Sequence, residues 1–178
     1  MKRSVIVVGV MVVMCSTLLQ AQAPIPNMSP IIGVWKVNVE KSTYFPGPRP
    51  AAAAAAQMRQ YVDRGHGVIA ELRMNVSSAG AVAFANVWLG KFDGSAAPVF
   101  NQNDLLTFLE TATKPMATRA YKVVDPYSME ATNKTGDRVN ATVTVAVSRE
   151  GKTITETVKA FNAQGQQAAQ NVVVYDRQ

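Results

Sequence analysis

Apolar and polar residues alternate one by one through two long stretches of the chain. In residues 68–76 one row of alternate positions is entirely apolar, and the other row contains Ile69, Glu71, Arg73 and Asn75. Residues 139–148 repeat this scheme, with valine and alanine in one row and mainly Asn, Thr and Ser in the other. A period of two is typical of β-strands, whose successive side chains point to opposite faces. Both stretches are therefore predicted strands, and Glu71 is expected on the face that meets water.

Turn-forming residues separate the strand patterns at short intervals. Gly, Pro, Asp and Asn occur near residues 63–67, 77–80, 93–94, 125–126, 134–137, 150–151 and 164–165. Antiparallel neighbours need only such short connections, whereas parallel strands need crossover segments that the pattern lacks. We predict an all-β fold, an antiparallel up-and-down meander of about 8–10 strands that closes into a barrel and so removes its exposed edges. An open, strongly curved sheet or a sandwich is the alternative.

The barrel domain is expected to span residues 31–178. Residues 24–30 form a proline-rich leader, which should run extended because proline lacks an amide donor. Residues 31–40 are rich in β-branched residues and predict the first strand. Residues 42–56 contain several prolines and a run of six alanines, so we expect a long loop there, either a lid or a low-complexity connection.

Residues 1–23 have the pattern of a secretory signal peptide. Lys2 and Arg3 precede an apolar stretch, and Ala21 and Ala23 supply the small residues of a cleavage site. Pro24 disfavours a cut directly before it, so cleavage after Ala21 and an uncleaved anchor are alternatives. The pattern predicts a secreted or periplasmic protein.

Composition and charge exclude several classes of protein. With 178 residues, 48% hydrophobic and 17% charged, the chain fits one globular domain and no disordered or large multidomain protein. The formal net charge is +6, but Lys and Arg are spread singly, so no nucleic-acid partner is expected. After the signal no apolar run approaches the roughly 20 residues of a membrane-spanning helix. The only cysteine, Cys15, lies in the signal, so the mature chain is expected to lack a disulfide.

No residue pattern predicts an active site, a metal centre or a cofactor site. His66, the only histidine, lies between two glycines at a predicted hairpin tip and has no Cys or second His nearby in the sequence. Glu71 and Glu156 could pair as the acid and base of a glycosidase, but charges opposite an apolar row usually face solvent. A G-x-S-x-G elbow is absent. We therefore predict that the protein is not an enzyme, with no catalytic residues, no metal and no cofactor.

Residues 33–35 read Gly-Val-Trp at the start of the first predicted strand. This G-x-W arrangement resembles the signature of lipocalins and related calycins, in which the tryptophan plugs the closed end of a barrel and a late basic side chain covers it. The resemblance implies structural roles for Gly33 and Trp35 and makes Arg177 the candidate cover, through a cation–ring contact of about 0.5–2 kcal/mol. Two other basic residues are alternatives: Arg149 and Lys159.

Further segments extend over most of the mature chain: GVWKVN (33–38), KSTYFPGP (41–48), KFDG (91–94), SREGKTIT (148–155), NAQGQ (162–166) and VVVYD (172–176). They resemble a family of uncharacterised secreted bacterial proteins with a lipocalin-like barrel, whose members often read G-T-W-K-L-N, K-S-x-Y-x-P-G-P and D-G-K-x-M-T-x-T. The resemblance implies export and a lipocalin-like fold, and it brings no established activity. The alanine run 51–56 and residues 101–115 depart from the family pattern.

A barrel of about eight or more strands has room for one small ligand where its inward side chains are small. Alanines at alternate positions of residues 81–85 could keep such space open. Three aromatic residues on predicted strands are the candidate ligand-binding residues, with ordinary core as the alternative: Phe84, Trp88 and Tyr121. We therefore expect a monomeric, exported module that binds a small hydrophobic or amphipathic molecule. The alternative is a structural or protein-interaction component of the cell envelope, with a filled barrel and no ligand.

Overall fold

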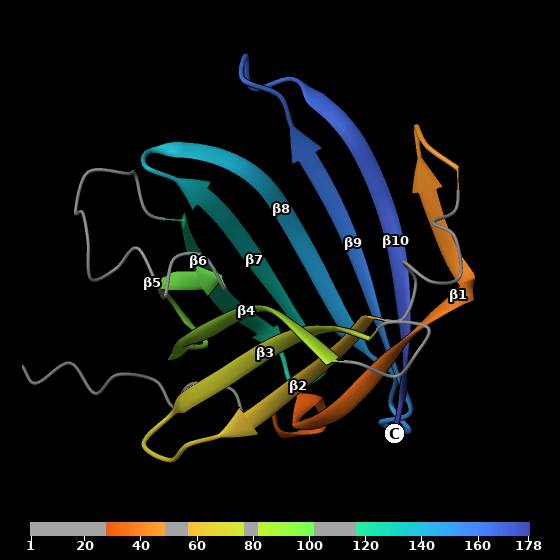
Figure 1. Ribbon diagram of the computed structural model, residues 1–178. Helices are drawn as coiled ribbons and strands as arrows, with labels where there is room; N and C mark the ends of the chain where they lie inside the picture. Colours follow the sequence, from red (N-terminus) through yellow and green to blue (C-terminus); the bar gives the residue numbers. More distant parts are fainter. Residues whose placement is uncertain (1–27, 49–56, 77–81, 102–116) are drawn as a thin grey trace, which may run out of the picture.

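The structure is a computed structural model that describes residues 28–48, 57–76, 82–101 and 117–178. Ten antiparallel strands form a closed barrel (Figure 1). Each strand is hydrogen-bonded to its neighbours in sequence, and the first strand closes the barrel against the last. The predicted all-β meander barrel is confirmed, and the open sheet and the sandwich are excluded.

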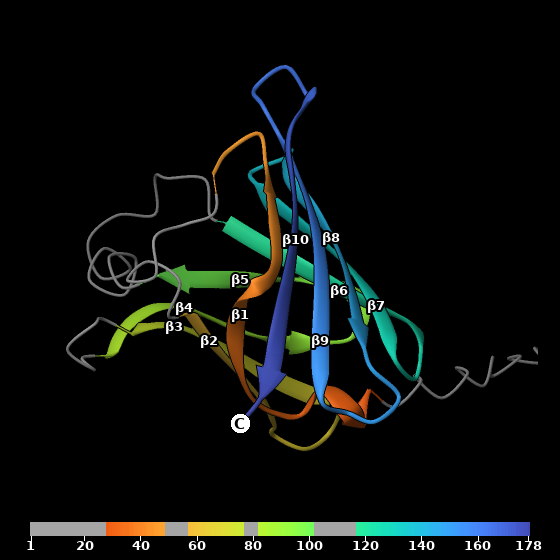
Figure 2. The same ribbon diagram turned by 90° about the vertical axis from the view of Figure 1, so that its right-hand side faces the viewer.

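The elements follow in chain order: η1 (Ser29–Ile31), β1 (Gly33–Phe45), β2 (Gln57–Asp63), β3 (Val68–Val76), β4 (Val82–Lys91), β5 (Asp93–Asn101), β6 (Ala117–Asp125), β7 (Ser128–Thr135), β8 (Arg138–Val147), β9 (Thr153–Phe161) and β10 (Gln167–Arg177). Because direction reverses at every strand, β1, β3, β5, β7 and β9 all begin at one end of the barrel. η1 and the C-terminus lie at this end, which we call the closed end (Figure 2). The β7–β8 and β9–β10 hairpins lie at the opposite end, the loop end.

The first strand is longer than the sequence pattern predicts. β1 continues to Phe45 because a register shift between Asn38 and Thr43 lets it resume its pairing with β10. Ser42 is buried at this bulge, where its hydroxyl donates to the Asn38 carbonyl (2.6 Å) and accepts from the Val174 amide (2.9 Å). Residues 42–45 therefore belong to the sheet and not to the predicted loop 42–56. Residues 49–56, with the alanine run, lie outside the described residues.

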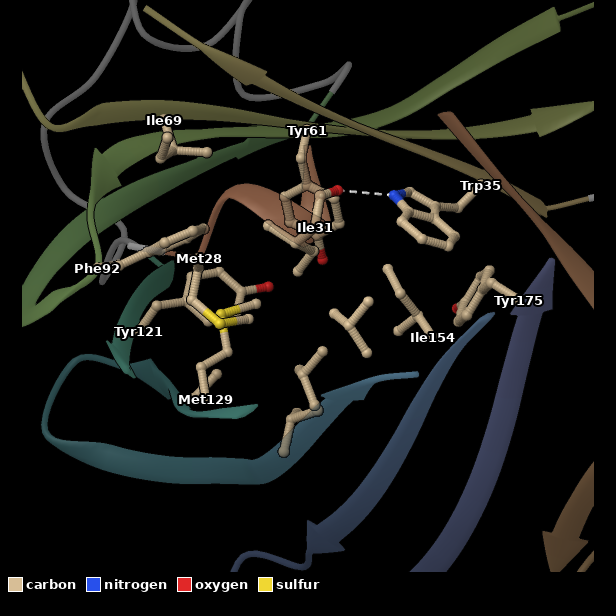
Figure 3. Close-up of a cluster of buried hydrophobic side chains, with 14 of the residues drawn as sticks. Met28, Ile31, Trp35, Tyr61, Ile69, Phe92, Tyr121, Met129, Ile154 and Tyr175 are labelled. Carbon is tan, nitrogen blue, oxygen red and sulfur yellow. Dashed lines mark hydrogen bonds between the residues drawn. The ribbon is translucent and has the colours of Figure 1, made fainter. Parts of the chain in front are cut away.

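A turn of 3-10 helix and a layer of apolar side chains fill the closed end. η1 forms where the end of an extended leader was expected, with Pro30 in its first turn. Its residue Ile31 and the preceding Met28 are buried in the core. The Trp35 indole is fully buried and donates to the Ile31 carbonyl at 2.8 Å (Figure 3). The same layer contains further buried residues: Ile69, Phe92, Val123, Met129, Val147 and Ile154.

Arg177 covers Trp35 from β10. Its guanidinium carbon lies 4.3 Å from the centroid of the indole ring, which is the contact that the G-x-W resemblance implied. The guanidinium also donates to three backbone carbonyls: those of Pro30, Ile32 and Gly151. Gly33 has a φ of 140°, and a Cβ there would lie 2.7 Å from the Arg177 Nη1. The backbone conformation therefore favours glycine at this position, and any side chain there would also displace the end of Arg177. Of the two alternative covers, Arg149 lies over Tyr127 and Lys159 is exposed on β9.

Most predicted turns coincide with the observed hairpins. The turns at 63–67, 125–126, 134–137, 150–151 and 164–165 each connect consecutive strands, and 93–94 follows a tight connection between β4 and β5. Residues 77–80 lie outside the described part of the chain. Within the residues that the structure describes, no helix combines the length and hydropathy needed to cross a membrane.

Replacing Arg177 tests whether its contacts with Trp35 and with three backbone carbonyls, here called the Arg177 clamp, stabilise the closed end. Arg177→Gln should lower the free energy of unfolding by about 1–3 kcal/mol, because a cation–ring contact and charge-assisted hydrogen bonds are lost. Arg64→Gln, in the exposed β2–β3 turn, is the matched control and should change stability by about 0.5 kcal/mol or less. Urea unfolding followed by tryptophan fluorescence measures both variants. Equal stability of the two would contradict the clamp.

Candidate functional site

Five charged side chains lie together inside the barrel. Arg59 comes from β2, Glu71 and Arg73 from β3, Arg119 from β6 and Glu156 from β9. Four of these side chains are at most 8% exposed, and Arg73 is the most accessible at 23%. We call this group the charged cluster. Charged residues are almost never fully buried without partners. The contacts within the cluster therefore determine the charge and the hydrogen-bonding capacity of the interior.

Strand alternation explains why the members of the cluster face inward. Arg59 and Tyr61 in β2, and Arg119 and Tyr121 in β6, are two residues apart and buried, so each pair shares the inner face of its strand. In register, Arg59 lies opposite Arg73 on the neighbouring strand. The cluster therefore combines side chains from strands on different sides of the barrel.

Glu71 is the centre of the cluster because it contacts all three arginines. Its Oε1 accepts from the Arg73 Nε at 2.7 Å and lies 3.5 Å from the Arg59 Nη1. Its Oε2 accepts from the Arg119 Nη1 and from the Tyr121 hydroxyl, the latter at 2.9 Å. A single carboxylate thus holds charges from three strands in place.

The charge state of Glu71 follows from these contacts. Burial by itself would raise the pKa of this carboxyl, but the positive charges of Arg73, Arg119 and Arg59 outweigh burial and hold its pKa well below the usual range. Burial, followed by the negative charge of the same carboxylate, raises the pKa of the Tyr61 and Tyr121 hydroxyls. Glu71 is therefore ionised and both tyrosines are neutral hydrogen-bond donors near neutral pH.

Arg59 connects Glu71 with the second carboxylate, Glu156. Its Nη1 donates to Glu156 Oε1, and its guanidinium carbon lies 4.7 Å from the centroid of the Tyr175 ring. Burial works against the charged form of Arg59, yet the attraction of Glu156 leaves its pKa well above the usual value. Burial also raises the pKa of Tyr175 to about 12. Arg59 is therefore a permanent cation within the barrel.

Two buried oxygen atoms near this network have no hydrogen-bond partner among the described residues. They are Oε2 of Glu156 and Oδ1 of Asn86. Asn86 lies on β4 directly opposite Arg73, on the side away from Arg59. Buried polar atoms are normally paired, so these two acceptors are exceptions among the described residues.

The predicted orientation of β3 is wrong. Ile69 and Glu71 are buried inside the barrel, so Val68, Ala70, Leu72 and Met74 lie on the outer face. The expectation that Glu71 and Glu156 face water is wrong for the same reason, as both are at most 1% exposed. Ion pairing with arginines from other strands stabilises these carboxylates inside, which the hydrophobic pattern of one strand cannot reveal.

The structure brings together two of the three candidate ligand-binding residues. Trp88 and Tyr121 are both buried, with ring centroids 5.0 Å apart in an edge-on arrangement, and Phe92 packs on both. The Trp88 indole donates to the Arg119 carbonyl at 2.9 Å, so this aromatic group adjoins the charged cluster. Phe84 pairs in register with Met74, and its side chain lies outside the described part of the structure. The side chains of the predicted alanine row at residues 81–85 also lie outside it.

The remaining candidate chemistry is not assembled in the described residues. His66 is exposed in the β2–β3 turn, as its flanking glycines indicated, with a φ of 52°. No group of three or more His, Cys, Asp or Glu side chains suited to a metal ion occurs within the described ranges. Glu71 and Glu156 both contact Arg59, which separates them, so they do not have the open arrangement of a glycosidase pair.

The charged cluster was missed by sequence reasoning, although the sequence contains a signal for it. Arg59 and Tyr61 repeat the spacing of Arg119 and Tyr121, and both pairs lie in strand patterns. An arginine and a tyrosine two residues apart share one face of a strand, and a tyrosine is a frequent inward residue. The repeated pair therefore indicates two arginines on the inner face.

Comparison with known proteins does not assign the chain: no protein-family model matches it, and no curated protein does.

Removing the central carboxylate should destabilise the barrel strongly. Glu71→Gln leaves three arginines with Glu156 as their only carboxylate in the cluster, and breaking a buried ion pair costs about 3–5 kcal/mol. Glu130→Gln, on an exposed position of β7, serves as the control and should be nearly neutral. Urea unfolding measures both. A Glu71→Gln variant as stable as the control would show that the arginines do not depend on this carboxylate.

The pKa of Glu71 predicts a dependence of stability on pH. The pKa is lower in the folded than in the unfolded chain, so the stabilisation is complete above the unfolded value of about 4.3 and is lost as the pH falls below it. The free energy of unfolding of the wild type should therefore decrease steadily below about pH 5, and Glu71→Gln should show a shallower decrease. Asp93, Asp125 and Asp176, whose pKa values are also lowered, retain their contributions in both proteins. Identical slopes would be inconsistent with an ionised Glu71.

Proposed function

We propose that this protein is an exported module that binds one small amphipathic molecule inside its barrel and does no catalysis. The observation that carries the proposal is the charged cluster inside a barrel whose other buried residues are largely apolar. A molecule with both a polar group and an apolar part would match such an interior, because the polar group could contact the charged cluster and the apolar part could contact the apolar inward side chains.

The inner faces between the cluster and the loop end support the apolar part of this proposal. Half-buried apolar side chains from several strands pack against the core: Val39, Tyr44, Ala97, Val99 and Val158. Ala141 and Ala160 lie opposite each other on β8 and β9 near the same end. The closed end, in contrast, is filled by large rings, including Trp35, Trp88 and Tyr121. We therefore place the binding site between the cluster and the loop end.

Export and family membership are part of the same proposal. The pattern of residues 1–23 favours a secretory signal peptide, and the segments described above resemble a family of secreted bacterial proteins with a lipocalin-like barrel. A monomer that carries a molecule in the periplasm or outside the cell fits these features. N-terminal sequencing of exported protein decides whether cleavage follows Ala21 or Ala23.

Ligand binding can be tested on the full-length precursor expressed in a bacterial host and collected as exported protein. Native mass spectrometry should detect a co-purifying small molecule, and fatty acids should change the combined emission of Trp35 and Trp88, of which Trp88 donates to the Arg119 carbonyl. Haem and neutral aromatics are compared in the same titrations. The absence both of a bound molecule and of any emission change across the panel would refute the proposal.

A second candidate is a structural or protein-interaction component of the envelope. Two observations favour it: the closed half of the barrel is packed with large side chains, and the outer faces of β2, β3 and β4 carry an apolar row. Leu89 is 53% exposed there, next to Ala70 on the neighbouring strand. A negative result in the ligand experiment, with the protein folded, would favour this function.

A further inference from the structure

The outer surface of the barrel is apolar over β2, β3, β4 and β5. Because outward and inward residues alternate along each strand, register pairing aligns the outward ones in rows across the sheet. Six apolar residues form two such rows: Val62, Ala70 and Leu89, and Leu72, Val87 and Phe100. Met58 and Met74, directly opposite each other, extend these rows, and Gln60 is the polar member of the second row. We call this set the apolar face. Leu89 is its most exposed residue at 53%, and the others are half-buried.

The opposite side of the barrel is polar. β3 and β8 are five places apart in the ring of ten strands, so they lie across the barrel from each other (Figure 1). The outward residues of β7, β8 and β9 form two polar rows: Glu130, Thr144 and Thr157, and Thr132, Thr142 and Lys159. The barrel that the structure describes is therefore amphipathic as a whole, with one apolar and one polar side.

Charge does not select the partner of the apolar face. The outward charged residues of β2–β5 and their described connections lie at the closed end, where Arg64 and Lys91 are balanced by Asp63 and Asp93. The face therefore attracts neither an acidic nor a basic surface preferentially. Its partner is recognised by apolar contact.

The size of the apolar face favours a lipid surface over a folded protein. Strands about 4.8 Å apart and outward residues about 6.6 Å apart along each strand give a footprint of about 400 Å². A stable protein interface buries about 800 Å² on each partner, so this face is about half of what a second copy of the chain would need. A bilayer needs no matching shape, since amphipathic surfaces adsorb by placing their apolar side among the lipid head groups.

The chain that precedes the barrel brings it to a membrane during export. Residues 4–19 are predominantly apolar, and residues 20–27 connect them to Met28 beside η1 at the closed end. Eight residues span at most about 28 Å even when fully extended. A barrel whose signal peptide is still in the membrane therefore lies within this distance of the lipid.

We propose that the apolar face docks the exported barrel on the surface of a lipid bilayer, with Leu89 and its row among the head groups and the threonine-rich side in water. The inference concerns the outside of the barrel and goes beyond the proposed function, because a ligand could bind inside with or without a membrane. Docking of this kind depends on apolar area, so it should need no anionic lipid and should persist at high salt.

Fluorescent labels on the two sides of the barrel identify the side that meets lipid. Leu89→Cys and Thr144→Cys, both at exposed positions, are each made in a Cys15→Ser background and labelled with the polarity-sensitive fluorophore NBD. Phosphatidylcholine vesicles should shift the emission of the Leu89 label to shorter wavelength and raise it at least about two-fold, because the label enters the head-group region. The Thr144 label should not change. This comparison holds whether or not the signal peptide has been removed.

Flotation with the same vesicles measures the affinity of the processed, exported protein. Leu72→Gln combined with Leu89→Gln should weaken binding at least about 10-fold, because two apolar side chains of the face are lost. Phe45→Gln is the matched control, since it removes a ring that is 69% exposed outside the face, and it should change binding less than about two-fold. Circular dichroism verifies that both variants are folded. Raising NaCl from about 0.1 to 0.5 M should leave wild-type binding within about two-fold.

Each other outcome overturns the inference. Equal responses of the two labels would remove the apolar face as the docking side. Binding that requires phosphatidylglycerol and disappears at high salt would be adsorption through the net positive charge. Unchanged labels together with a dimer in sedimentation velocity would assign the face to a second copy. All three leave the proposed function in place if native mass spectrometry still detects a bound small molecule.

Discussion

The interior of this barrel depends on the neutralisation of three arginines by Glu71. Each guanidinium loses hydration when its strand joins the sheet, and such a loss is tolerated only where a carboxylate and further hydrogen bonds replace the water. Glu71 uses both oxygens for this purpose and is assisted by the hydroxyl of Tyr121. Because the arginines come from β2, β3 and β6, the ion pairs can form only when the sheet has curved far enough to bring these strands face to face. Closure of the barrel and charge compensation are therefore coupled.

The two ends of the barrel differ in how tightly their inward side chains are packed. At the closed end, Trp35 is held between the carbonyl of Ile31 and the guanidinium of Arg177, so β1, η1 and β10 are joined around one indole ring. The large rings above it exclude water from the lower side of the charged cluster, which strengthens the attraction between Glu71 and its arginines. Toward the loop end several inward residues are only half-buried, among them Val158 and Ala160. The most exposed member of the cluster is Arg73, which lies nearer the loop end of β3 than Glu71.

The fold was predictable from the sequence because period-two alternation and short turns are local signals. They identified the strands and the meander, and glycine and tryptophan at 33 and 35 indicated the closed end. The inner face of β3 was not predictable in this way. Its row of Val68, Ala70, Leu72 and Met74 is more hydrophobic than the row with Glu71, and a single strand offers no reason to bury a carboxylate. The reason is supplied by Arg119, which is 48 residues away in the chain and adjacent in space. Long-range ion pairs of this kind override local hydrophobicity.

The orientation of β3 also changes what a hydrophobic ligand would encounter. With the apolar row inside, the barrel interior would be apolar, and the affinity for a ligand would depend on the apolar area of the ligand alone. With Glu71 and the arginines inside, a purely apolar molecule that reached the cluster would have to separate charged groups from any water that solvates them, without replacing their hydrogen bonds. Under the proposed function such a molecule would bind poorly, whereas one with a polar end would bind better. Under the proposed binding function, the cluster that stabilises the closed sheet would also restrict which molecules bind, so that stability and specificity would rest on the same side chains.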